Sequence, residues 1–187
     1  MQRVFVDTNV LFPFSVMDLM LALTEDGVHE LLWTEVLLGE WEDVVTRDHG
    51  RAESTAVAII NAIREFFADS EVPEANYLPL VAEMPGNDPD DRIHMAAAIA
   101  GEASAIVTWN RKDFPAKSLA EHGLEVLDPD TYLCALADEF PDEIRSTLTR
   151  LTAAKRRPQM STTQVLNALD KAGVPQFAAQ VRRSIDR

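Results

Sequence analysis

Four acidic residues stand at points from which a folded chain can bring them together, namely Asp7, Glu40, Asp91 and Asp113. Asp7 directly follows the β-rich run at residues 3–6, and Asp113 comes shortly after the apolar run at residues 105–108. Both runs are typical of buried strands. Ligands of an open parallel sheet bind beyond the carboxyl ends of its strands, so both acids are predicted at that edge.

The other two acids are placed on helices that can face the same edge. Asp91 begins the alanine-rich stretch at residues 90–100, and a carboxylate is favoured at the N-terminal end of a helix. Glu40 lies one turn after Val36 on a predicted helix and can point inward with it. The four carboxylates are therefore expected to converge.

A cluster of carboxylates needs a counter-charge, because neighbouring carboxylates repel and raise one another's pKa. Oxygen ligands favour Mg²⁺, Mn²⁺ or Ca²⁺ over Zn²⁺. Such a cation would lower the pKa of a water and stabilise the leaving oxygen in phosphodiester hydrolysis. The sequence holds no G-x-S-x-G, P-loop or G-x-G-x-x-G motif that would indicate another chemistry.

The histidines are scattered along the chain and are interpreted as surface or packing residues (His29, His49, His94 and His122). His94 carries slightly more weight than the other three because it lies one turn after Asp91. Trp109 stands beside the predicted edge and is interpreted as a packing residue, with stacking on a base as the alternative.

The elements that must position the acids alternate between strands and helices. Strands are predicted at residues 3–6, 105–108 and 124–127, and helices at 15–25, after Thr34 as far as Gly50, at 56–67 and at 90–100, with Ser15 as a predicted N-cap. Residues 70–90 hold four of the ten prolines and are predicted to form an irregular connection, with a short strand near residues 80–82. This order predicts an α/β fold, a three-layer sandwich around a parallel sheet.

The last part of the chain is predicted to contain helices only. Pro158 divides it, Ser161 or Thr162 caps the next helix, and residues 173–175 turn into a last helix. We therefore predict a first domain at residues 1–135 and a small all-helical C-terminal extension at residues 140–187.

Charge is distributed unevenly between these two parts. The whole chain carries −14, but residues 145–187 carry nine basic and two acidic residues, so the rest is strongly acidic. The basic tail has three candidate uses, which are gripping an RNA backbone, docking an acidic partner and completing a dimer. Its densest patch is the candidate RNA contact (Lys155, Arg156 and Arg157), and binding there should weaken with salt.

Composition indicates a soluble globular protein, with 47% hydrophobic and 26% charged residues. The apolar stretches are too short to span a bilayer, and the N-terminus reaches Asp7 after one short apolar run, unlike a signal peptide. Cys134 is the single cysteine and excludes an internal disulfide. A cytoplasmic location is therefore predicted.

Four segments resemble PIN domains, in the order that this family has. Residues 4–9, Val-Phe-Val-Asp-Thr-Asn, resemble the opening strand, and Glu40 resembles the second acid, on a helix. Asp91, ahead of three alanines, resembles the third acid, and residues 108–115 resemble the final Thr-x-Asn-x-x-Asp-Phe segment. The resemblance covers about residues 1–135, and the tail resembles the helical extension of a subset of PIN-domain toxins.

This resemblance implies a Mg²⁺- or Mn²⁺-dependent endoribonuclease, the VapC-type toxin of a VapBC toxin–antitoxin pair. Its substrate would be RNA and its partner a cognate antitoxin, and homodimers are common in the family. The resemblance implies metal binding by the four acids and hydrogen-bonding support by two further residues (Asp7, Glu40, Asp91 and Asp113; Thr8 and Asn110).

Several alternatives remain open. Asp113 could equally be the N-cap of a short turn, and Asp88 and Asp90 crowd Asp91. The fold could be a catalytically inactive PIN module that binds RNA or protein, although all four acids are retained. A phosphoryl-transfer receiver or phosphatase is disfavoured because Asp7-Thr8-Asn9 lacks a second Asp, and only Lys112 directly follows a strand.

Overall fold

A parallel sheet forms the centre of the molecule in the computed structural model, which describes residues 1–47, 53–155 and 159–185. Its order is β2-β1-β3-β4, and the bounds are β1 Gln2–Val6, β2 His29–Leu32, β3 Ala105–Val107 and β4 Glu125–Leu127. Val4 pairs with Leu31 on one side and with Ala105 on the other. β1 and β3 are thus the central strands. The predicted α/β fold with a parallel sheet is confirmed.

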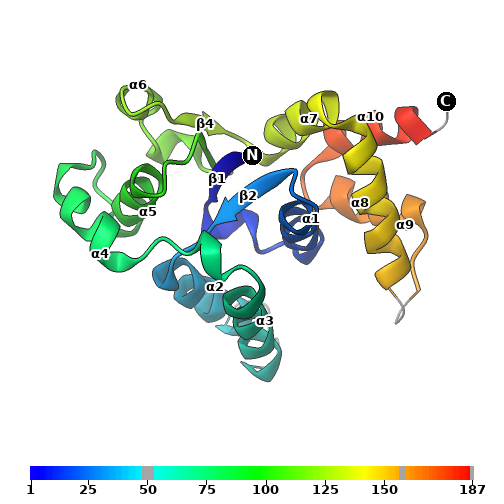
Figure 1. The fold of residues 1–187 in the computed structure, drawn as a ribbon, viewed down its shortest axis with the longest axis horizontal. Coiled ribbons are helices and arrows are strands. Elements are labelled where there is room, and N and C mark those ends of the chain that lie inside the picture. Colours follow the sequence, from blue (N-terminus) through cyan, green and yellow to red (C-terminus); the bar gives the residue numbers. More distant parts are fainter. Residues whose placement is uncertain (48–52, 156–158, 186–187) are drawn as a thin grey trace.

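Helices cover both faces of this sheet, with α5 on one side and α1 on the other (Figure 1). The bounds in the described residues are α1 Phe14–Glu25, α2 Glu35–Arg47, α3 Glu53–Phe66, α4 Glu74–Tyr77, α5 Pro89–Ala100, α6 Ala116–Ala120, α7 Pro129–Glu139, α8 Pro141–Ala154, α9 Thr162–Lys171 and α10 Pro175–Ile185. Short 3-10 helices are η1 Thr8–Val10, η2 Ala68–Ser70, η3 Leu78–Glu83 and η4 Arg111–Asp113. None of the helices in this described part is long and apolar enough to cross a membrane.

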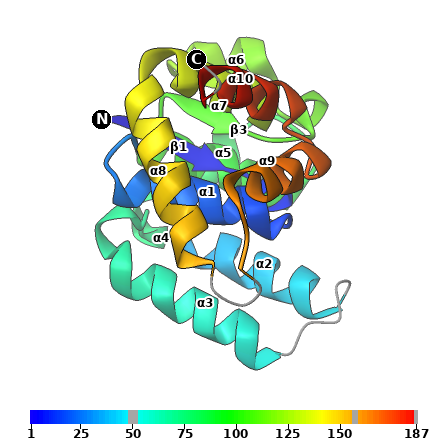
Figure 2. The same cartoon turned by 90° about the vertical axis from the view of Figure 1, so that its right-hand side faces the viewer.

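Helix α1 is buried on most of its circumference, because apolar residues occur on both of its sides. Val16, Met20 and Leu23 are fully buried, and so is Leu19. The helix packs against β2 on one side, while α8 and α9 lie across its other side (Figure 2). A helix with apolar residues all round needs such cover on more than one face.

The C-terminal helices are joined to the rest of the chain by α7 and by ion pairs. α10 packs against α7 and α9. Arg150 of α8 pairs with Glu25 at 2.6 Å and with Asp26 at 3.1 Å, and Lys155 pairs with Asp18. Part of the basic charge of the tail is therefore paired with acidic residues that lie in α1 or directly after it.

Three local predictions turn out differently in the structure. Strand β2 was not predicted, and residues 80–82 belong to the 3-10 helix η3 rather than to a strand, since Pro79 starts a helical turn. Helix α1 begins at Phe14 with no side-chain cap, so Ser15 is not its N-cap, and Ser15 Oγ donates to the carbonyl of Ala168 instead. The predicted caps are confirmed at Thr34, which accepts from Leu37 N, and at Ser161, which forms a capping box with Gln164.

His29 is a buried histidine that ties β2 to the surrounding helices. Its Nδ1 lies 2.7 Å from the Tyr132 hydroxyl and its Nε2 lies 2.9 Å from the carbonyl oxygen of Met20. The carbonyl needs a donor, so Nε2 carries the proton and Nδ1 accepts from Tyr132. Burial lowers the pKa of His29 from 6.5 to about 4, and the hydrogen bond to Met20 only partly opposes it.

We expect the free energy of unfolding to fall as the pH drops from about 6.5 to about 4. The unfolded chain binds a proton at His29 in this window while the folded chain does not, so the cost approaches roughly 3 kcal/mol. Urea denaturation at several pH values measures it. His29→Gln should show a shallower pH slope than wild type, and His122→Gln, at an exposed site, should show the wild-type slope. Equal slopes in all three proteins would contradict the assignment.

Candidate active site

Asp7 lies at the carboxyl end of β1, where the chain is still extended and the residue is only 6% exposed. Its backbone N–H donates to the carbonyl of Val107 at 2.9 Å, which extends the pairing of β1 with β3. Its Oδ2 accepts hydrogen bonds from Thr108 Oγ1 at 2.6 Å and from Asn9 Nδ2 at 2.5 Å. Two polar side chains therefore fix the orientation of this buried carboxylate.

The segment after β3 brings a second acid to the same edge. Thr108 Oγ1 accepts from the backbone N–H of Asn110 at 2.9 Å, which turns the chain after the strand. The Asn110 side-chain amide then donates to Asp113 Oδ2. Asp113 ends the short helix η4 and is half-buried. Asn110, predicted as a supporting residue, therefore holds one oxygen of Asp113.

Glu40 reaches the edge from α2 and is also held at one oxygen. Thr8 Oγ1 donates to Glu40 Oε2 at 2.7 Å. The other oxygen of this carboxylate, Oε1, is buried and has no hydrogen-bond partner. A buried oxygen without a donor is costly, so this atom fits a place where a cation or a ligand donor binds.

His94 of α5 lies between Asp7 and Glu40, which the sequence analysis did not foresee. Its Nδ1 is 3.6 Å from Asp7 Oδ1, its Nε2 is 3.3 Å from Glu40 Oε2, and the residue is only 2% exposed. Neither nitrogen forms a well-aligned hydrogen bond, although each lies close to a carboxylate oxygen. Burial alone lowers the pKa of His94, but the two carboxylates outweigh it and raise the pKa to about 9.

The interpretation of His94 as a surface or packing residue was therefore wrong in one respect: it is buried, but between two acids. The signal was its position three residues after Asp91, because residues at this spacing share one face of a helix. His29 is buried as well, whereas His122 is exposed and His49 lies outside the described residues.

Asp91 stands in the first turn of α5 and is half-buried. The helix is capped by Asp88, whose side chain accepts from Asp90 N at 3.0 Å. Burial, together with the charges of Asp88, Asp7 and Asp113, raises the pKa of Asp91 to about 6, and His94 opposes this shift only in part. Negative charges from three separate segments therefore reach this carboxyl group.

A hollow opens beside Asp91 and Asp113. It is lined by Gly86, Asn87, Asp88, Asp91, Lys112, Asp113 and Pro115. Three carboxylates and one cation thus border it. This hollow connects the acids with solvent and is the place where a ligand can approach them.

The four candidate acids lie in two groups rather than in one closed cluster. Asp7 and Glu40 flank His94, while Asp91 and Asp113 line the hollow. Among the described residues no group of three or more His, Cys, Asp or Glu side chains is arranged as it stands to hold a metal ion. The oxygen donors, the raised pKa of Asp91 and the unpartnered Glu40 Oε1 nevertheless fit a hard divalent cation at this edge.

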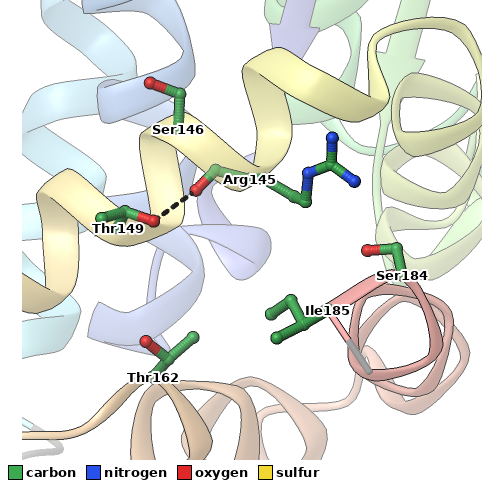
Figure 3. A pocket seen from close by; sticks show the side chains of 6 residues that line it. All are labelled: Arg145, Ser146, Thr149, Thr162, Ser184 and Ile185. Carbon is green, nitrogen blue, oxygen red and sulfur yellow. Dashed lines mark hydrogen bonds between the residues drawn. The ribbon is translucent and has the colours of Figure 1, made fainter. Parts of the chain in front are cut away.

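The predicted RNA-contacting patch lies far along the chain from these acids. Lys155 pairs with Asp18 of α1, so its charge already has a partner, and Arg156 and Arg157 lie outside the described residues. A separate hollow between α8, α9 and α10 is lined by none of the candidate site residues (Figure 3). Its lining residues are Arg145, Ser146, Thr149, Thr162, Ser184 and Ile185.

Comparison with known proteins identifies a family for this chain. Residues 3–112 match the PIN domain, and the chain belongs to the PIN-domain family. Residues 129–183 match the VapC50 C-terminal domain. A relative from Mycobacterium tuberculosis (strain ATCC 25618 / H37Rv), "Putative ribonuclease VapC50", is 35% identical over 107 residues, which are 57% of this chain and 62% of the relative. The match spans less than two thirds of that relative's length, and it confirms the resemblance seen in the sequence.

Proposed function

We propose that this protein is a metal-dependent endoribonuclease that hydrolyses RNA phosphodiester bonds, and that it is the toxin of a VapBC-type toxin–antitoxin pair. The observation that supports this most is the gathering of acids from four distant segments at one sheet edge. Asp7 and Glu40 flank His94, and Asp91 and Asp113 border one hollow. The family membership and the similarity to a protein named as a ribonuclease support the same proposal.

Each of three acids has one oxygen held by a neighbouring donor. Thr108 and Asn9 hold Asp7, Thr8 holds Glu40, and Asn110 holds Asp113. Side chains fixed in this way are preorganised, so little reorganisation is needed when a ligand binds. Asp7, Glu40, Asp91 and Asp113 would hold Mg²⁺ or Mn²⁺, which when bound supplies Lewis-acid activation of water and offsets negative charge on the phosphodiester.

Residues of the chain would position the substrate and control which groups at the site are protonated. Half-buried Asp91 has a pKa raised to about 6, and a cation at the edge would favour its charged form. His94 lies between Asp7 and Glu40 and supplies positive charge to both. Lys112 is the basic residue that borders the hollow and is suited to contact a phosphate.

The antitoxin would bind at the acidic edge and block access to it. A basic side chain of the partner that enters the hollow beside Asp88, Asp91 and Asp113 would meet three carboxylates. We further propose that residues 1–135 form the nuclease domain and residues 140–187 the helical extension, and that the protein forms a homodimer. α7, which spans the end of the first part, packs against α10 of the second.

Cleavage of RNA should require a divalent cation and the carboxylate of Asp91. We expect wild type to cut a structured RNA in Mg²⁺ or Mn²⁺ and to lose the activity in excess EDTA. Asp91→Asn should lower the cleavage rate by about 10²-fold or more, because it removes one charged oxygen ligand. The measurement is the initial rate of product formation on a denaturing gel.

Asp90→Asn is the matched control, since Asp90 is exposed, neighbours Asp91 and has an ordinary place in the first turn of α5. It should cut at the wild-type rate. Equal rates in wild type and in Asp91→Asn would indicate a contaminating nuclease. RNA binding without cleavage by wild type in any divalent cation would favour the inactive PIN module instead.

A further inference from the structure

Trp109 is an exposed aromatic side chain placed between two residues of the candidate site. It follows Thr108, which donates to Asp7, and precedes Asn110, which donates to Asp113. Its side chain is 38% exposed, whereas Trp33 and Trp41 are 2% and 1% exposed. The interpretation of Trp109 as a packing residue therefore accounts for only part of its surface.

The structure holds Trp109 from two directions. Its backbone N–H donates to Asn9 Oδ1 at 3.2 Å, and the amide of the same Asn9 donates to Asp7 Oδ2. Its six-membered ring lies against Gly173 in the turn between α9 and α10, where an added Cβ would stand 3.0 Å from the indole. Gly173 also has φ +102°, a conformation that other residues rarely adopt. One side of the indole is thus supported by the turn between α9 and α10, and 38% of the residue remains exposed.

The acidic surroundings of Trp109 favour a contact with RNA that does not depend on charge. The candidate edge is acidic, and phosphates are repelled there unless a cation is bound. Arg111, two residues further on, lies 3.5 Å from Asp128, so its charge is partly compensated. An aromatic ring attracts a nucleobase without needing any charge, because the two flat surfaces stack.

We propose that Trp109 is a stacking platform for an unpaired base of the RNA next to the bond that is cut. This rests on the proposed function and adds a residue that would position the RNA at the cleavage site. In a duplex both faces of each base are covered by its neighbours, so only an unpaired base can present its face to the indole. Gly173 makes the C-terminal helices part of this binding surface.

Intrinsic fluorescence tests the contact directly, because Trp109 is the one tryptophan of three that solvent and ligand can reach. The probe is an unstructured RNA 12-mer, added to the full chain in EDTA and, separately, in Ca²⁺ in place of Mg²⁺. We expect saturable quenching by this strand and much weaker quenching by the same strand annealed to its complement. Trp109→Phe should abolish the quenching, since a phenylalanine ring at this position would still stack on the base but would not contribute tryptophan fluorescence. No quenching by the single strand in either buffer would overturn the proposal.

A second measurement uses cleavage and keeps the two proposals separable. Trp109→Ala should raise the KM for a single-stranded substrate by roughly 5- to 150-fold, the range expected for loss of one stacked base, and Trp109→Phe should restore most of it. Phe66→Ala is the matched control. Phe66 is 72% exposed and borders a hollow with Met1 and Glu30, at the other end of the strands from Asp7.

Thermal unfolding establishes that each variant is folded before its KM is compared. If wild type cuts RNA but Trp109→Ala has an unchanged KM, the stacking platform is wrong and the nuclease proposal stands. If wild type fails to cut but its fluorescence is quenched by the single strand, the nuclease proposal is wrong and the binding surface stands. Equal cleavage of single-stranded and fully paired RNA by wild type would also overturn the stacking role of Trp109.

Discussion

Asp7→Asn is expected to reduce RNA cleavage by about 10²–10³-fold while leaving the shape of the side chain unchanged. Asp7 is the most buried of the four candidate acids, and Thr108 and Asn9 aim its carboxylate. Asparagine retains one oxygen but lacks the charge that a divalent cation needs. The measurement is the single-turnover rate with protein in excess over a labelled RNA.

The control for Asp7→Asn is far-UV circular dichroism together with the thermal midpoint. Loss of charge at position 7 removes one partner of the buried His94, so some loss of stability is expected. Rates are therefore compared at a temperature at which both proteins are folded. A folded Asp7→Asn protein that cuts RNA at the wild-type rate would refute the assignment of Asp7 to the active site.

Asp130→Ala is expected to have the largest effect on stability. Asp130 is 5% exposed on α7, and its carboxylate accepts the backbone N–H groups of Gln176 at 3.1 Å and of Phe177 at 2.8 Å. It thereby caps α10 from another helix. Removing it leaves two backbone donors without this acceptor, one of them buried, and we expect the free energy of unfolding to fall by about 2–3 kcal/mol.

Urea denaturation measures this loss as a lower midpoint at an unchanged slope. Asp142→Ala is the matched control, because Asp142 is largely exposed and its ion pair with Arg145 on the same helix contributes little. Asp130→Asn should fall between wild type and the alanine variant, since its amide oxygen can still accept. Equal midpoints for Asp130→Ala and Asp142→Ala would show that the cap does not hold α10.

The sequence predicts the edge of the sheet better than it predicts the contacts there. The apolar runs before Asp7 and before Thr108 place both segments at the carboxyl ends of central strands, because only buried strands tolerate such runs. The helical spacing of α5 puts Asp91 and His94 on one face. It does not reveal that Glu40 lies opposite His94, since that contact joins residues 54 positions apart and depends on how α2 packs.

Two elements were mispredicted for reasons of local composition. β2 consists of His-Glu-Leu-Leu, which holds no β-branched or aromatic residue, and its pairing with β1 overrides that weak preference. Residues 80–82 looked like a short apolar strand, but Pro79 and the contact of η3 with α5 favour a helical turn. Arg92 supports this turn by donating to the carbonyls of Val81 and Ala82.

Net charge alone does not tell which groups the basic residues of the tail contact. Gripping RNA, docking an acidic partner and completing a dimer were all candidate uses, and in the structure Arg150 and Lys155 pair with acids that lie in α1 or directly after it. These pairs join residues more than 120 positions apart, and no pattern in the sequence indicates them.

The position of α1 between the sheet and the C-terminal helices restricts how the two parts of this protein can be dissected. A chain shortened before α8 would expose the apolar side of α1 that α8 covers. It would also leave three acidic residues without their basic partners. Such a truncated protein would tend to aggregate for reasons unrelated to RNA. The duties of the extension are therefore better tested by single substitutions in the intact chain than by deletion.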